Sequence, residues 1–185
     1  MGNPLHERRT AAEWSAASQV IEIDEKISVF EQLSAVVEDD LAMLDADKRP
    51  ADWRDTQVTG RLEFGFADAQ QQLPRVHCRV ATNAHAVCQR CLEPFRLPLE
   101  AEADLLLLDL EQDVDGYDDH EVWELEDKLL RPRDIVEELL IMALPFSAMH
   151  TESAACRTLS AESEGSVEKI TTPFAALREQ MAKDN

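Results

Sequence analysis

The chain has no apolar run near the length that a membrane span requires. A transmembrane helix needs about 20 consecutive apolar residues, whereas the apolar residues here, 44% of the chain, are interspersed with charged ones. The N-terminal sequence, MGNPLHERRTAAEWSAASQ, also lacks the apolar stretch of a secretory signal. We therefore expect a cytoplasmic protein that has no membrane partner.

Glycine is scarce, and its positions exclude the common phosphate-binding loops. The five glycines, at positions 2, 60, 65, 116 and 165, form neither a G-x-G-x-x-G motif nor a Walker loop. A G-x-S-x-G nucleophile elbow is also absent. Paired acids such as Asp118 and Asp119 fall in an expected loop, where they face solvent rather than hold a catalytic metal. The sequence thus predicts no enzyme and no small-molecule substrate.

Positive charge is in short supply as well. Lys and Arg number 18 against 38 Asp and Glu, which gives a formal net charge of -20. This charge opposes whole-surface attraction to nucleic acid phosphates and favours basic partners. Two local basic spots are the exception, and their six arginines are candidate contacts to RNA or a partner: Arg75, Arg79, Arg90, Arg96, Arg131 and Arg133. The alternative is that they form ion pairs with the abundant carboxylates.

The four cysteines are too few to staple a secreted domain of this length with disulfides. On its expected strand, Cys78 falls on the same side as the apolar residues, which predicts that its side chain is a small buried apolar group. Cys88 and Cys91 form a C-x-x-C pair, and two thiolates at this spacing can bind one zinc from a tight turn. A second ligand pair lies downstream, so the candidate metal ligands are Cys88, Cys91, His150 and Cys156.

Two other interpretations of the C-x-x-C pair stay open. It can be a reduced, metal-free pair at a strand turn, or a dithiol redox pair, although a thioredoxin-like motif would precede a helix and LEPFRLPLE resembles a strand. His77 and His85 are expected on the surface, with His85 as the reserve ligand if His150 does not reach the site.

The apolar periodicity predicts an α+β fold, with an antiparallel sheet core packed with a few helices. Three- and four-residue steps indicate helices at Lys26–Leu44, capped by Asp24, and at Asp134–Leu144, ended by Pro145. Between them, from about Gln57 to Leu108, a period of two predicts strands with one solvated face. The tetrapeptide VWEL is a further candidate strand.

We expect one α+β domain over residues 21–150, with an acidic loop at about 109–121. Residues 1–20 are expected to be a flexible N-terminal arm that Trp14 anchors to the domain. Residues 151–185 are expected to be a flexible C-terminal tail with a short helix at about 173–182. This helix is too small to fold alone, so its apolar face predicts partner docking by Phe174, Leu177 and Met181.

Four segments in order resemble the YceD family. They are VCQRCLEPFRLPLE followed by acids, DIVEELLIMALPF, His150 with Cys156, and TPFAAL. The resemblance covers roughly residues 55–178; the N-terminal forty residues differ, and Leu139 stands where the family usually has an acid. It implies a bacterial cytoplasmic, non-enzymatic factor for large-subunit ribosomal RNA accumulation, in a family genetically associated with a small, basic large-subunit ribosomal protein.

The net charge and the implied link to RNA favour different partners. In one model the basic strip from Arg75 to Arg96 contacts ribosomal RNA. In the other, the acid-rich surface binds a basic large-subunit ribosomal protein, and opposite charge speeds their encounter. We favour the second as the main contact. A zinc-stabilised structural adaptor and a C-x-x-C dithiol redox protein, both without ribosomal partners, are the alternatives.

Overall fold

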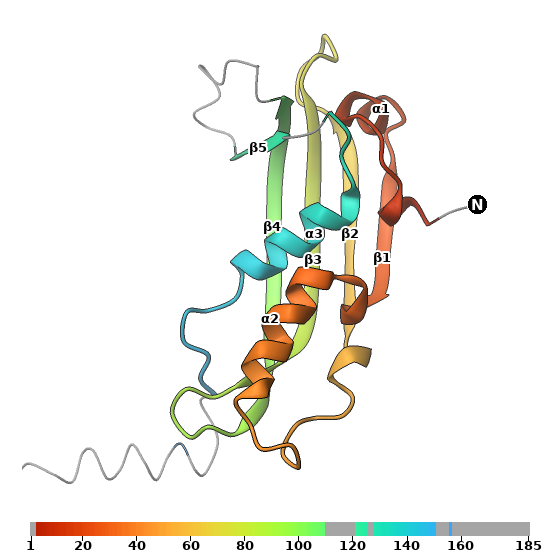
Figure 1. The fold of residues 1–185 in the computed structure, drawn as a ribbon. Helices are drawn as coiled ribbons and strands as arrows, with labels where there is room; N and C mark the ends of the chain where they lie inside the picture. Colours follow the sequence, from red (N-terminus) through yellow and green to blue (C-terminus); the bar gives the residue numbers. More distant parts are fainter. Residues whose placement is uncertain (1–2, 110–120, 126–127, 151–155, 157–185) are drawn as a thin grey trace, which may run out of the picture. The chain divides into compact units, whose positions relative to one another are not determined.

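The computed structural model describes residues 3–109, 121–125, 128–150 and 156. The chain divides into two compact units, Met1–His150 and Thr151–Asn185, and Cys156 is the described residue of the second. The first unit contains a five-stranded sheet in the order β1-β2-β3-β4-β5 (Figure 1). Its strands are β1 (Val20–Lys26), β2 (Gln57–Phe66), β3 (Pro74–Val87), β4 (Pro94–Asp109) and β5 (Glu121–Leu125).

Neighbouring strands are antiparallel except for β4 and β5, which are parallel. Helices α2 and α3 lie across one face of the sheet, which we call the inner face (Figure 1). The helical segments are η1 (Pro4–His6), α1 (Ala11–Ala16), η2 (Ile27–Val29), α2 (Glu31–Ala42), η3 (Trp53–Asp55) and α3 (Pro132–Met142). The predicted α+β class is therefore confirmed. None of the helices in the described ranges is long and apolar enough to cross a bilayer.

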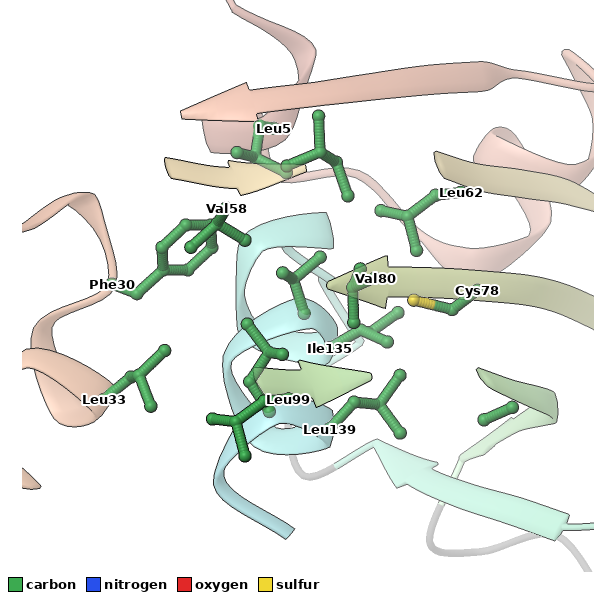
Figure 2. Close-up of a cluster of buried hydrophobic side chains, with 14 of the residues drawn as sticks. Leu5, Phe30, Leu33, Val58, Leu62, Cys78, Val80, Leu99, Ile135 and Leu139 are labelled. Atoms are coloured by element: carbon green, nitrogen blue, oxygen red, sulfur yellow. The ribbon is translucent and has the colours of Figure 1, made fainter. Parts of the chain in front are cut away.

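The inner face of the sheet carries the alternating apolar residues that the sequence predicts. Their side chains interdigitate with those of the helices in one core (Figure 2). The strands contribute Val58, Leu62, Phe64, Val76, Cys78, Val80, Leu99, Ala103 and Leu105. Each large side chain removed from water stabilises the fold by about 1.5–3 kcal/mol, so this face determines most of the stability.

The helix predicted from Lys26 begins later, and Asp24 does not cap it. Asp24 lies in β1, opposite Thr59 of β2, because Ile21 and Ile23 alternate toward the core and make this segment a strand. Helix α2 instead receives a cap from another helix. The buried Glu137 of α3 accepts hydrogen bonds from the backbone N–H groups of Gln32 and Leu33, at 2.5 and 3.0 Å.

The N-terminal segment packs on the domain through Trp14. Its ring is fully buried and stacks on Phe64 with 5.4 Å between ring centroids. Its Nε1 donates a hydrogen bond to the Leu130 carbonyl at 3.3 Å. Thr10 and Glu13 form a capping box that begins α1. Large aromatic surface and a satisfied indole N–H together hold this segment in place.

Helix α3 begins two residues earlier than expected, and its apolar residues are only partly buried. Ile135 and Leu139 are buried, but Met142 is exposed, because the helix ends there and the chain turns away toward Pro145. The VWEL segment is strand β5, as predicted. Residues 110–120 of the acidic loop lie outside the described residues. So does the expected helix at 173–182, with Phe174, Leu177 and Met181.

Candidate metal centre

The C-x-x-C pair lies at the turn that joins β3 to β4, as predicted. Cys88 follows the last residue of β3, and its N–H donates to the Glu93 carbonyl at 3.0 Å. The Leu92 N–H donates back to the Cys88 carbonyl at 2.9 Å, which requires a φ of 57° at Leu92. This tight reversal presents two sulfurs from one turn, which suits a tetrahedral metal.

The segment after α3 brings His150 to the same turn. The Gln89 N–H donates to the Ala148 carbonyl at 2.9 Å, and this bond holds the segment against the hairpin. The imidazole of His150 packs on the ring of Phe95, with 5.0 Å between centroids. Its Nε2 lies 3.6 Å from the Cys91 sulfur. Its Nδ1 is buried and has no hydrogen-bond partner among the described residues.

These side chains are positioned to hold a metal ion. Within the first unit, the ligand atoms of Cys88, Cys91 and His150 lie within 4.8 Å of one another. Zinc binds sulfur at about 2.3 Å and nitrogen at about 2.0–2.1 Å, so a tetrahedral ion sets one sulfur and one nitrogen about 3.6 Å apart. The observed separation of Cys91 and His150 matches this value. The first unit therefore supplies three candidate ligands.

Cys78 and His85 stand apart from this cluster. Burial raises the pKa of Cys78 to about 12, so the thiol stays protonated and acts as the small core residue that its parity predicts. The prediction of a surface position for His85 is wrong, because only 8% of this residue is exposed. Asp52 covers it, with its Oδ1 3.6 Å from Nε2. His85 is not in the metal cluster.

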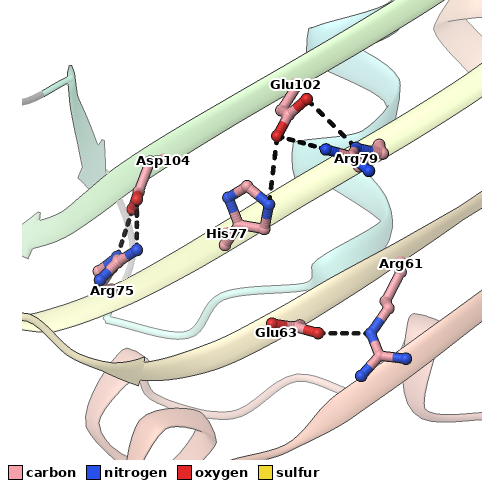
Figure 3. A network of polar contacts seen from close by, with 7 residues as sticks. All are labelled: Arg61, Glu63, Arg75, His77, Arg79, Glu102 and Asp104. Atoms are coloured by element: carbon pink, nitrogen blue, oxygen red, sulfur yellow. Dashed lines mark hydrogen bonds and ion pairs between the residues drawn. The ribbon is translucent and has the colours of Figure 1, made fainter.

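Two of the candidate arginines lie on the solvated outer face of the sheet, where they pair with β4 (Figure 3). Arg75 binds both carboxylate oxygens of Asp104. Arg79 binds Glu102 at 2.8 Å, and this hydrogen bond lowers the pKa of the Glu102 carboxyl. Each cation therefore already faces an acid across the strand pair.

The other candidate arginines belong to different elements. Arg96 donates to Asp52 at 3.0 Å, near the hairpin end of the sheet. Arg131 and Arg133 lie at the start of α3, 3.8 Å from Asp134 and 3.3 Å from Glu31 respectively, and Arg90 lies in the hairpin turn. The alternative of local ion pairs thus describes Arg75, Arg79, Arg96, Arg131 and Arg133.

Sequence reasoning missed one side chain that organises the helical layer. Glu137 is among the few buried polar residues, yet its sequence context, DIVEELL, resembles an ordinary helix with solvated acids. Its function as the cap of α2 depends on a contact across more than 100 residues. No periodicity could reveal that contact.

A family model described as "Large ribosomal RNA subunit accumulation protein YceD" matches residues 76–180, more than half of the chain. The matched range contains the hairpin cysteines, α3, His150 and Cys156. No curated protein and no solved structure matches the chain.

Proposed function

Because the chain belongs to the YceD family, we propose that it is a non-enzymatic ribosome biogenesis factor that acts in the cytoplasm. The family description implies a role in the accumulation of large-subunit ribosomal RNA. In our proposal the protein serves this role by binding, with a basic large-subunit ribosomal protein as its main partner and ribosomal RNA contacts as secondary. It requires no small-molecule substrate and no membrane.

The charge distribution is the observation that carries this choice of partner. The net charge of -20 repels phosphates and accelerates encounter with a basic polypeptide. Three of the arginines already form ion pairs: Arg75 with Asp104, Arg79 with Glu102, and Arg96 with Asp52. Little uncompensated positive charge remains on this strip for a phosphate backbone. A bound basic protein would also be shielded from incorrect RNA contacts until delivery.

A pull-down of the tagged full-length protein from lysate, with and without ribonuclease, tests the proposal. We expect basic large-subunit ribosomal proteins to remain bound after ribonuclease at low salt and to be lost at moderate salt, because salt screens opposite charges. The double variant Arg75→Gln/Arg79→Gln should retain them equally. If ribonuclease abolishes all retention, and this double variant does so too, direct RNA binding replaces the protein model.

We further propose that zinc occupies the cysteine cluster, with Cys88, Cys91, His150 and Cys156 as its ligands. The metal would have a structural role, fastening the segment that carries His150 to the β3–β4 turn, since metal binding of this kind contributes folding free energy. The strand-to-strand position of the C-x-x-C pair favours this role over redox chemistry. Partner docking by Phe174, Leu177 and Met181 belongs to the same proposal.

Metal analysis of the reduced, purified protein tests the zinc site. We expect about one zinc per chain, and Cys88→Ser should lose both zinc and thermal stability. Cys78→Ala is the matched control, because it removes a buried thiol outside the cluster and should keep the zinc. Absence of metal from the reduced wild-type protein would leave a metal-free adaptor with a thiol pair.

A further inference from the structure

A small apolar cavity lies beside the hairpin, apart from the metal ligands. It has a volume of about 180 Å³ and lies between α2, the β3–β4 hairpin and the segment after α3. Its apolar walls include Val36, Val37, Leu97, Leu144 and Phe146. Metabolite pockets usually measure about 300–1,000 Å³. This cavity therefore suits one large side chain rather than a free small molecule.

Apolar side chains at the rim of the cavity are exposed to solvent. Phe146 is fully exposed, and Val36 is 41% exposed. Met142 and Met149, which bracket Phe146 in sequence but do not line the cavity, are exposed as well. Neighbouring apolar side chains in water mark interaction sites, and methionine adapts to partners of different shapes. This rim has the composition of a docking site.

The wall also carries an unsatisfied polar group. His85 lines the cavity, and its buried Nε2 has no hydrogen-bond partner among the described residues. A buried polar atom without a partner costs about 1–3 kcal/mol. Asp40, the one charged residue of the wall, accepts a hydrogen bond from the Val87 N–H at 2.6 Å. The Oδ1 of Asp52 lies 3.6 Å from the Nε2 of His85, so this nitrogen does not select an occupant of the cavity.

The charge around the cavity selects among occupants. From Glu38 to Asp47 the chain has five acids, of which Glu38 pairs with Arg54 at 2.7 Å, and Lys48 and Arg49 come next. The guanidinium of Arg49, which follows, is directed to the carbonyls of Ala42 and Leu44. A second copy of this chain would bring another net charge of -20 and be repelled. A basic polypeptide would be attracted.

We propose that this cavity receives one apolar side chain of a basic polypeptide, flanked on that polypeptide by lysines or arginines that face the acids of α2. The inference rests on the proposed function and locates its main protein contact. Burial of the apolar side chain slows dissociation of the complex, and the opposite charges around it speed association.

The test measures retention of a defined probe, the basic proteins extracted from purified large ribosomal subunits, on immobilised full-length protein. Phe146→Ser and Val36→Lys should each reduce retention at least several-fold. Met43→Ser is the control, because Met43 is an exposed apolar residue just after α2 that does not line the cavity. Circular dichroism verifies that each variant is folded.

The outcomes separate this inference from the proposed function. If the wild-type protein retains none of the extracted proteins, the proposed partner fails and the docking site with it. If it retains them and both cavity variants bind equally well, only the docking site is overturned.

A methyl NMR spectrum distinguishes the other occupants. The probe should shift the resonances of Val36 and Leu97. If Phe174→Ser shifts the same resonances without the probe, the chain's own tail occupies the cavity and the proposal is wrong. A dimer in sedimentation that Phe146→Ser dissociates would also overturn it.

Discussion

The two faces of the sheet are built from the same strands but differ in what their side chains contribute. On the inner face, Leu62 and Val80 are buried against the helices. On the outer face, their neighbours Arg61, Glu63 and Arg79 form exposed ion pairs (Figure 3). Alternation along one strand thus separates apolar packing, which stabilises the fold, from surface charge, which contributes little stability and is open to partners.

The separation ends near the hairpin turn. His85 has the outer-face parity of His77 and Arg79, yet it is buried, because Asp52 of the segment before β2 lies over it. The metal cluster and the apolar cavity occupy this same end of the sheet. Both proposed sites therefore lie where the simple division into two faces fails.

The largest expected effect comes from the core that the inner face shares with the helices. Phe30 is fully buried in the core, so Phe30→Ala should lower the free energy of unfolding by about 3–5 kcal/mol. Urea denaturation followed by circular dichroism measures this loss. Glu63→Ala on the outer face is the control and should change the stability little. Equal losses in the two variants would contradict the comparison of the faces.

A smaller loss is expected from the polar link within the helical layer. Glu137→Ala leaves the N–H groups of Gln32 and Leu33 without their acceptor, which should cost about 1–3 kcal/mol. Glu137→Gln keeps an acceptor oxygen of similar reach and should recover part of the loss in the same denaturation assay. A glutamine variant as unstable as the alanine variant would show that charge, not capping, stabilises this contact.

Because His85 is buried, the stability of the fold should depend on pH. Burial, reinforced by the Arg96 guanidinium, lowers the pKa of His85 from 6.5, against a smaller raising effect of Asp52. Below about pH 6.5 the unfolded chain therefore binds a proton more readily than the folded one, and stability falls as the pH drops toward the folded pKa. His85→Gln should have a flatter stability profile between pH 7.5 and 5.5. Identical profiles would exclude this contribution.

The smallest effect is expected from the outer face. A double-mutant cycle of Arg75→Ala and Asp104→Ala should give a coupling of about 0.2–1 kcal/mol, because both side chains are well exposed and water screens their attraction. The coupling should decrease further in 1 M NaCl. A coupling of several kcal/mol would mean that this face stabilises the fold as the inner face does.

Much of the fold follows from local pattern. The strict alternation around Leu62, Val80 and Leu99 predicts β2, β3 and β4, since a period of two has one structural meaning over such lengths. Strand β1 is short, with only two alternating isoleucines before a helical pattern, so the sequence predicts no strand there and places only a helix cap at Asp24. The C-x-x-C pair predicts its own turn, because Val87 ends one extended segment, Phe95 begins the next alternation, and only a tight reversal fits between them.

The amino-acid sequence by itself determined the α+β class, the hairpin that carries Cys88 and Cys91, and the net acidic charge. These depend on periodicity, spacing and composition, which are local or additive quantities. Only the tertiary structure decided that Glu137 caps α2, that Asp52 buries His85, and that His150 lies 3.6 Å from Cys91. Each of these depends on contacts between residues more than 30 positions apart, and chain folding rather than sequence pattern brings such residues together.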